Sequence, residues 1–270
     1  MTAFINHTLI EFRSSIRSKQ LLFLNYAFPL GFYVMMGLVM TQINPLFTET
    51  MVPAMVLFSL MAAILLGMPD PLVNARESGI FRSYKIMGIP ARNILIVPAL
   101  NTVMHVIIVC IIILITGPLF FNAPGPDNLL AFLIVTLASM IAHTGVGALI
   151  SVISSSSRAT VLWSQLIFLP SMLLSGLMMP YEMLPASAQT FARLFPATYS
   201  MIGYKELAYT GGGGAIAVWS LVILVTGGLL AFGLAIALFS WDSYNTSQRR
   251  HQALGLLALL PYILGAVFLR

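Results

Sequence analysis

The sequence predicts an all-helical integral membrane protein, and its composition carries most of that prediction. Of the 270 residues, 59% are hydrophobic and only 8% are charged, whereas an average soluble domain is about one quarter charged. The mean hydropathy is +0.95. Apolar runs close to the length that crosses a bilayer, about 20 residues, recur along the chain. A single cysteine, Cys110, excludes an internal disulfide framework and a cysteine-based metal site.

The first 19 residues predict a helix that lies in the membrane interface rather than crossing it. Ile5, Leu9, Phe12 and Ile16 recur at helical spacing, and basic residues gather toward the end of the segment. An apolar stripe beside a charged face is typical of helices that lie along a membrane surface. The segment lacks the short hydrophobic core and the cleavage site of a signal peptide. We therefore expect an interfacial helix over residues 1–19.

Six apolar segments predict membrane-spanning helices. They cover residues 21–40, 51–68, 94–120, 129–153, 160–179 and 215–240. Pro69 and Pro71 are expected to end the second span. A last apolar segment, residues 253–269, has 17 residues, which is near the lower limit for a crossing, and Pro261 interrupts it. Two interpretations of this segment stay open: a seventh span, or an interfacial or re-entrant helix.

The distribution of Lys and Arg predicts a cytoplasmic N-terminus, because basic residues concentrate in the cytoplasmic loops of membrane proteins. With this orientation ten of the 13 basic residues face the cytoplasm, namely Arg13, Arg17, Lys19, Arg76, Arg82, Lys85, Arg92, Arg158, Arg249 and Arg250. The charged segment between the second and third spans then lies inside. The region 180–210 lies outside.

Residues 74–92 predict a short amphipathic helix in water at the cytoplasmic face. The segment carries the charged residues Arg76, Glu77, Arg82, Lys85 and Arg92. It cannot lie in hydrocarbon, because each ionised side chain at the bilayer centre costs several kcal/mol.

The limits of this helix are predicted from its capping residues. Asn74 is expected to be the N-cap, because Glu77 follows it three residues later, as in a capping box. Gly88 followed by Pro90 is a stop signal. Between these limits we expect the apolar residues to form one stripe, made of Ile80, Tyr84 and Met87.

The region 180–210 predicts short helices that re-enter the outer leaflet. Its apolar pieces are each too short to span a membrane and are separated by prolines. Irregular backbone at membrane depth must be buried in protein or line a water-filled cavity. An ordinary surface loop is the alternative, but the density of Phe, Leu and Met favours re-entrant helices. Residues 211–214 are all glycine and predict a flexible linker.

No motif predicts an enzyme. The sequence contains no G-x-x-x-x-G-K-[ST], no H-E-x-x-H and no G-x-S-x-G. The eight acidic residues are dispersed, so no paired-carboxylate metal site is expected. The basic residues are scattered singly, which argues against nucleic acid as a partner. His105 and His143 lie near the middle of the third and fourth spans, and they are candidates either for a functional site or for hydrogen bonds between helices.

Two motifs resemble those of the membrane subunits of ABC-2 type exporters, in particular the drug and natural-product branch. The first is the run from Arg76-Glu77 through Gly79 and Arg82 to Lys85, followed by Pro90, which is similar to the coupling segment of the family. The second runs from Leu174-Ser175-Gly176 through Pro180 and Leu184-Pro185 to Pro196-Ala197-Thr198-Tyr199, and it resembles the outer signature after the fifth span. With the interfacial helix and six spans, the likeness covers about residues 1–250. The last apolar segment departs from it, because six spans are usual.

The resemblance implies a single six-span ABC-2 (type V) exporter transmembrane domain over residues 1–270, in a bacterial cytoplasmic membrane. Residues 74–92 would be the coupling helix, in a cleft of a separate ATP-binding subunit. Two such subunits would hold ATP and Mg²⁺, and a second permease subunit, identical or paralogous, would complete the transporter. This chain itself would hold no cofactor, no metal and no catalytic residue.

The resemblance also implies roles for individual residues. The coupling residues would be Arg76, Glu77, Gly79, Arg82, Tyr84 and Lys85. Because the first and fifth spans face the dimer axis in the family, the transport path would include Phe28, Tyr33, Met36, Phe168, Met172, Ser175 and Met178, for which dimer packing is the alternative role. The outer re-entrant motif would consist of Ser175, Gly176, Pro180, Leu184, Pro185, Pro196 and Tyr199.

We therefore expect a permease that exports an amphipathic or lipid-like compound, such as a drug, antibiotic or natural product, because Phe, Met and Tyr line the implied path. Export of sodium or of a polysaccharide–lipid is the alternative within the family. Outside it, the alternatives are a proton- or ion-coupled carrier, an enzyme acting on lipid, and a scaffold or immunity protein. The spans contain no carboxylate, which argues against the carrier.

Overall fold

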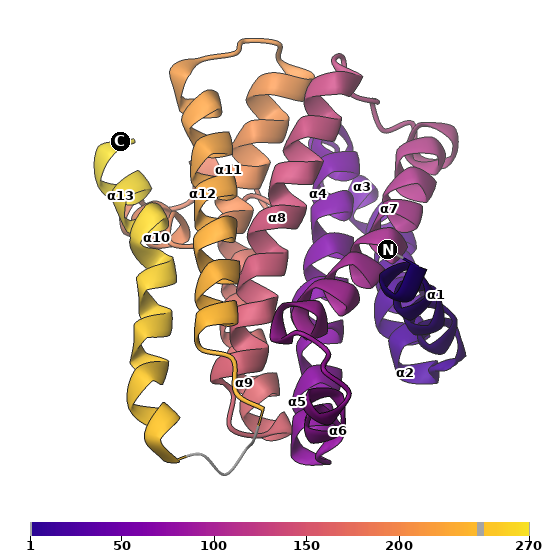
Figure 1. The fold of residues 1–270 in the computed structure, drawn as a ribbon. Helices are drawn as coiled ribbons and strands as arrows, with labels where there is room; N and C mark the ends of the chain where they lie inside the picture. The colour runs from indigo at the N-terminus through magenta and orange to yellow at the C-terminus, as the bar shows by residue number, and fades with distance from the viewer. Residues whose placement is uncertain (1, 242–245, 270) are drawn as a thin grey trace.

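Helices account for most of the chain in the computed structural model, which describes residues 2–241 and 246–269 (Figure 1). The α-helices are α1 (Thr2–Arg17), α2 (Lys19–Leu22), α3 (Phe28–Ile43), α4 (Phe47–Met61), α5 (Pro69–Glu77), α6 (Ile80–Ile86), α7 (Ala91–Phe121), α8 (Leu129–Ile153), α9 (Ser157–Leu174), α10 (Ala186–Ala192), α11 (Pro196–Gly203), α12 (Ala215–Ala237) and α13 (Leu260–Phe268). Segments with π or 3₁₀ geometry are η1 (Phe23–Ala27), η2 (Ala62–Gly67), η3 (Tyr181–Met183), η4 (Tyr204–Tyr209) and η5 (Thr246–Leu259). The described residues include no strand, which confirms the all-helical prediction.

Within the described ranges, five helical stretches are long and apolar enough to cross a membrane. They are Lys19–Ile43, Phe47–Glu77, Ala91–Phe121, Leu129–Ile153 and Ala215–Ala237. The predicted span 160–179 corresponds to α9, which is not among the five and ends at Leu174. Arg158, Gln165 and several serines lower the hydropathy of α9. The structure therefore contains five such spans and one shorter, more polar helix where six spans were expected.

The second span does not end at Pro69 and Pro71. Instead α4, η2 and α5 follow one another, and the stretch Phe47–Glu77 counts as one helical stretch. Proline is tolerated in the first turn of a helix, where its missing N–H would have no partner. Pro69 occupies that position in α5. The prediction was wrong because these prolines begin a helical segment rather than end one.

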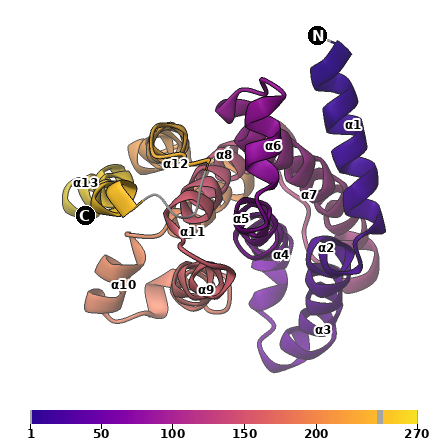
Figure 2. The ribbon, with the colours of Figure 1, turned by 60° about the horizontal axis from the view of Figure 1, so that its bottom comes forward.

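The N-terminal helix α1 lies at the edge of the bundle and packs against α7 (Figure 2). Ser15 is buried, and Asn101 Nδ2 donates a hydrogen bond to Ser15 Oγ over 2.6 Å. The Phe12 ring stacks on the imidazole of His105 with a centroid distance of 4.6 Å. The predicted stripe residues Leu9 and Ile16 stay exposed on α1, as a helix facing lipid requires. The side chains of Ile5, Arg249 and Arg250, used in the predictions above, lie outside the described part of the chain.

The core of the bundle combines α4 with the pair α8 and α12. α4 and η2 are almost entirely buried. Gly145 of α8 lies directly against the carbonyl group of Gly228 in α12, so a side chain at position 145 would overlap that backbone. Small residues let helix backbones approach closely in membranes. This contact places the helix that follows the re-entrant region tightly against α8.

The short helices α10 and α11 lie within the height that α8 and α12 span (Figure 1). Pro196, Thr198 and Tyr199 of α11 are buried, so this part of the region is packed inside protein rather than forming a surface loop. The C-terminal segment, η5 followed by α13, runs beside α12 for most of its length. Residues 253–268 form a shorter apolar helical stretch that is not among the five candidate spans, so a seventh span and an interfacial or re-entrant helix both stay predictions for this segment.

Candidate docking surface and transport path

The segment predicted as one helix over residues 74–92 forms parts of two helices and a connection. Asn74 lies inside α5 and is not a cap. Gly79 separates α5 from α6 in the left-handed conformation, with φ of 79°, which glycine adopts without steric cost. Gly88 has φ of 72° and follows α6, so the predicted stop signal at this glycine is confirmed. Pro90 precedes Ala91, the first residue of α7.

Arg76 does not face solvent, although its position in the coupling motif suggested that it would. Its side chain is 7% exposed. The guanidinium donates from Nη1 to the carbonyl oxygens of Ser151 and Val152, over 3.3 and 3.2 Å, and from Nη2 to that of Ser154. These carbonyls belong to the end of α8. The structure thus ties Arg76 into the chain itself.

The other coupling residues lie on or near the surface at this end of the bundle. Glu77, Arg82 and Lys85 are exposed, and Gly79 and Tyr84 are half-buried. The pKa of Tyr84 is raised, first by burial and then by the carboxylate of Glu11 in α1. The α5–α6 end therefore presents charge of both signs, with Glu77 at the end of α5 and Arg82 and Lys85 on α6.

The buried side of α6 differs from the predicted stripe. Phe81 is buried, and its ring packs against Phe239 at a centroid distance of 5.5 Å. Ile80 and Met87 are exposed to 45% and 63%, and Ile86 to 87%. Phe81 was missed because its partner lies beyond α12, far along the sequence. Of the predicted stripe, Ile80 and Met87 are therefore exposed, and only Tyr84 is half-buried.

The predicted path residues fall into two groups. Phe28 and Phe168 both pack on the ring of Phe58, with centroid distances of 5.5 and 5.7 Å. Phe58 of α4 therefore connects the first membrane helix with α9. Tyr33 is buried and shares a hydrogen bond with Thr116 of α7, with 2.9 Å between their oxygens. Met36 is also buried, whereas Met172 and Met178 are half-buried and Ser175 is buried.

Tyr33 and Met36 thus pack within this chain. The sequence did not predict that Phe58 would contact both Phe28 and Phe168. No local pattern marks Phe58, because these contacts follow from the placement of α4 between α3 and α9 (Figure 2).

The outer motif residues mark where short helices begin and end. Ser175 is the C-cap of α9, and Gly176 follows with φ of 94°. Pro180 precedes η3, Pro185 precedes α10, and Pro196 is at the start of α11. Leu184 and Tyr199 are buried. A shallow hollow lies between residues 176–180 and the start of α4, and of the predicted path residues only Met178 lines it.

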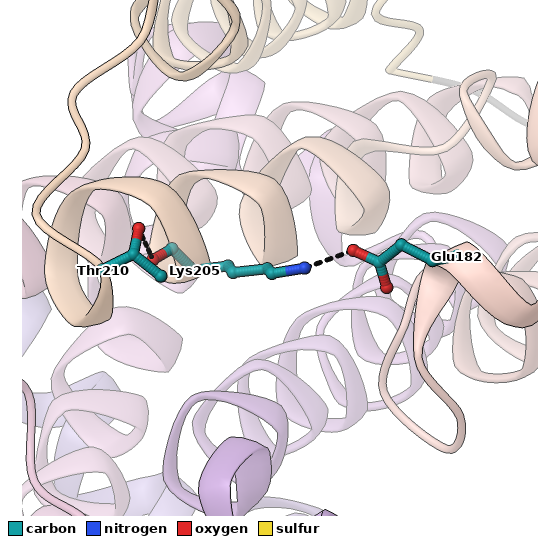
Figure 3. Close-up of polar contacts among 3 residues, drawn as sticks. All are labelled: Glu182, Lys205 and Thr210. Atoms are coloured by element: carbon teal, nitrogen blue, oxygen red, sulfur yellow. Dashed lines mark hydrogen bonds and ion pairs between the residues drawn. The ribbon is translucent and has the colours of Figure 1, made fainter.

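The polar surface of the re-entrant region holds an ion pair between Lys205 and Glu182 (Figure 3). The hydrogen bond from Lys205 lowers the pKa of the Glu182 carboxyl. Thr210 Oγ1 donates to the carbonyl of Lys205 over 3.0 Å and so closes η4. This pair joins η3 to η4 across α10 and α11.

His105 and His143 each use one ring nitrogen inside the chain. His105 Nδ1 lies 2.6 Å from Tyr26 Oη, and His143 Nδ1 lies 2.7 Å from the Ser139 carbonyl oxygen. The predicted structural role of these histidines was a hydrogen bond between helices. The hydrogen bond of His143 instead joins two residues of the same helix, α8. Among the described residues, no group of three His, Cys, Asp or Glu side chains could hold a metal ion.

The comparisons with known proteins agree with the geometry. A family model described as ABC-2 type transporter matches residues 3–209, which is well over half of the chain. No curated protein and no solved structure matches the sequence. The match includes α1, the α5–α6 end and the outer motif up to η4, and it stops before α12. The chain therefore belongs to the ABC-2 type transporter family and is a permease component whose sequence contains no ATPase domain.

Proposed function

We propose that this permease exports an amphipathic or lipid-like compound, such as a drug, antibiotic or natural product, across a bacterial cytoplasmic membrane with its N-terminus inside. Two ATP-binding subunits, which carry ATP and Mg²⁺, supply the energy and dock on α5 and α6. A second permease subunit, identical or paralogous, completes the complex.

The observation that carries the proposal is the exposed apolar surface of α6. Ile86 and Met87 are exposed to 87% and 63% in a segment that also carries exposed Arg82 and Lys85. The charges exclude hydrocarbon as the environment of α6. Exposed apolar side chains on a short helix in water mark a protein-binding surface. An ATP-binding subunit is the partner that permeases of this family have.

The proposed cargo rests on the side chains near the first membrane helix and α9. Phe28, Phe168, Met172 and Met178 are apolar or aromatic, and methionine adapts its shape to varied apolar ligands. The acidic residues of the sequence lie outside the predicted spans, so a bare cation would find no carboxylate within them.

The docking surface is tested by copurification. The tagged permease is solubilised from its native membranes, and the ATP-binding subunit that copurifies is identified by mass spectrometry. Ile86→Ser is expected to weaken its binding about tenfold, because truncating an interface anchor costs about 1–2 kcal/mol. Phe120→Ser is the matched control, since Phe120 is 74% exposed at the opposite end of α7.

Equal recovery of the ATP-binding subunit with Ile86→Ser and with the wild-type permease would refute docking on α6. Recovery of the wild-type permease without any ATP-binding subunit would refute the pairing itself.

A further inference from the structure

The end of α8 is held by a buried cation from α5. Arg76 lies one residue before the end of α5, and its guanidinium donates to the carbonyls of Ser151, Val152 and Ser154. The last carbonyls of a helix have no partner within the helix, and they carry partial negative charge. A guanidinium presents several N–H groups in a planar fork, so one side chain can serve several of these acceptors.

A second polar contact joins α5 to the start of α9. Ser157 Oγ donates to Asn74 Oδ1 over 2.7 Å, and Asn74 Nδ2 donates to Asp70 Oδ2 over 3.1 Å. Ser157 is the first residue of α9, and Ser154 is the C-cap of α8. Asn74 and Arg76 therefore bind the two sides of the same turn.

The contacts of Arg76 are difficult to break. A buried charge costs free energy unless its hydrogen bonds are satisfied, so separation of α5 from α8 would leave both a cation and three carbonyls without their partners. α5 and the α8–α9 turn should consequently move together when α6 is displaced. α9 carries Phe168 and ends at Leu174, and its C-cap Ser175 is the first residue of the outer motif that the structure buries.

We propose that Arg76 is a positioning residue that passes movement of the α5–α6 end to α9 through the α8–α9 turn, instead of contacting the ATP-binding subunit. That the movement comes from ATP-binding subunits docked on α5 and α6 rests on the proposed function. The rigid connection of α5 to the α8–α9 turn through Arg76 does not rest on it.

The connection is tested by measuring the distance between two spin labels, one on each side of it. The labels are attached at Ser83→Cys in α6 and Leu162→Cys in α9, both at exposed positions, after the buried Cys110 is replaced by Ala. Distances are measured in the purified complex without nucleotide and after trapping with ATP and vanadate. We expect a narrow distribution that is the same in both states.

Arg76→Gln is expected to broaden the distance distribution and to make it depend on nucleotide. Arg76→Lys keeps the positive charge but loses the planar fork of N–H donors, so its distribution should be broader than that of the wild type and narrower than that of Arg76→Gln. Arg92→Gln is the matched control, because Arg92 is an exposed arginine at the start of α7. If the Arg76→Gln permease does not insert into the membrane, the Arg76→Lys permease is compared with the wild type instead, and a smaller broadening of the distance distribution is expected.

A wild-type distance that changes with nucleotide would overturn the proposal, and so would an Arg76→Gln distribution as narrow as that of the wild type. The nucleotide-free comparison of the wild type with Arg76→Gln is also made on the purified permease alone, without an ATP-binding subunit. A failure of docking on α6 can therefore be distinguished from a failure of the Arg76 connection.

Discussion

The contact between Tyr262 and Gly227 shows how firmly the C-terminal segment is held. Tyr262 of α13 is 1% exposed. A Cβ atom added to Gly227 of α12 would lie 2.5 Å from Tyr262 Oη and 2.6 Å from its Cζ. Carbon atoms in contact prefer separations of about 3.5–4.0 Å, so the ring would have to move by about 1 Å. Gly227→Ala should therefore push α13 away from α12.

The size of the effect follows from a second glycine in the same helix. A Cβ at Gly233 would meet no atom within 4 Å. Both substitutions gain the same helix propensity, about 1 kcal/mol, so the difference between the two variants isolates the steric clash. Overpacking of this kind costs about 1–3 kcal/mol. We expect Gly227→Ala to be less stable than Gly233→Ala by that amount.

The assay is unfolding of the purified permease in detergent, with the double variant Gly227→Ala/Tyr262→Leu as a rescue. Removing the phenol ring also removes the clash, so the cost of Gly227→Ala should largely disappear in the Tyr262→Leu background. If the two glycine variants are equally stable, or if Tyr262→Leu rescues nothing, then α13 is not packed on α12 and the reasoning fails.

Two further predictions concern single polar contacts. Because Lys205 lowers the pKa of Glu182, their pair stabilises the fold above the unfolded pKa of the carboxyl, about 4.3, and this contribution is lost as the pH falls through the lower folded value. Both side chains are more than half exposed, so Glu182→Gln should cost only about 0.5 kcal/mol at pH 7, and this cost should decrease as the pH falls below the unfolded pKa; a difference in unfolding midpoint that does not decrease would contradict this. Tyr33→Phe should lower the unfolding free energy by about 0.5–1.5 kcal/mol, because the Thr116 hydroxyl keeps its bond to the Ile112 carbonyl over 2.6 Å and loses only the Tyr33 hydroxyl that donates to it. An unchanged midpoint in detergent would argue that the Tyr33–Thr116 hydrogen bond is absent.

Local properties of the sequence predicted the long helices well. The predicted span 129–153 has the same limits as α8, because hydropathy changes sharply at Asn128 and at the serines after Ile153. The helix terminator Gly88 was also predicted from the sequence, since its positive φ favours glycine. Prolines were ambiguous: Pro69 begins a helical segment, although it was expected to end one.

The contacts of individual side chains could not be predicted in the same way. Arg76 looked like a surface residue in its own segment, but its acceptors lie 75 and more residues further along the chain. The partner of Tyr33 in α7 likewise lies 83 residues away, and the place of Tyr33 in the transport path stays a prediction. Periodicity and motif spacing describe one helix at a time, and they contain no information about which helix a side chain will meet.

The family match ends at residue 209, but the structure does not divide there. The Arg193 guanidinium, inside the matched part, donates to the Leu269 carbonyl at the end of α13. Tyr199 of the outer motif donates to the Tyr262 carbonyl over 3.2 Å. In a family member that lacks this C-terminal segment, Arg193 and Tyr199 would need other hydrogen-bond acceptors. The position of α10 and α11 is therefore set jointly by the outer motif and by a C-terminal segment that the motif does not include.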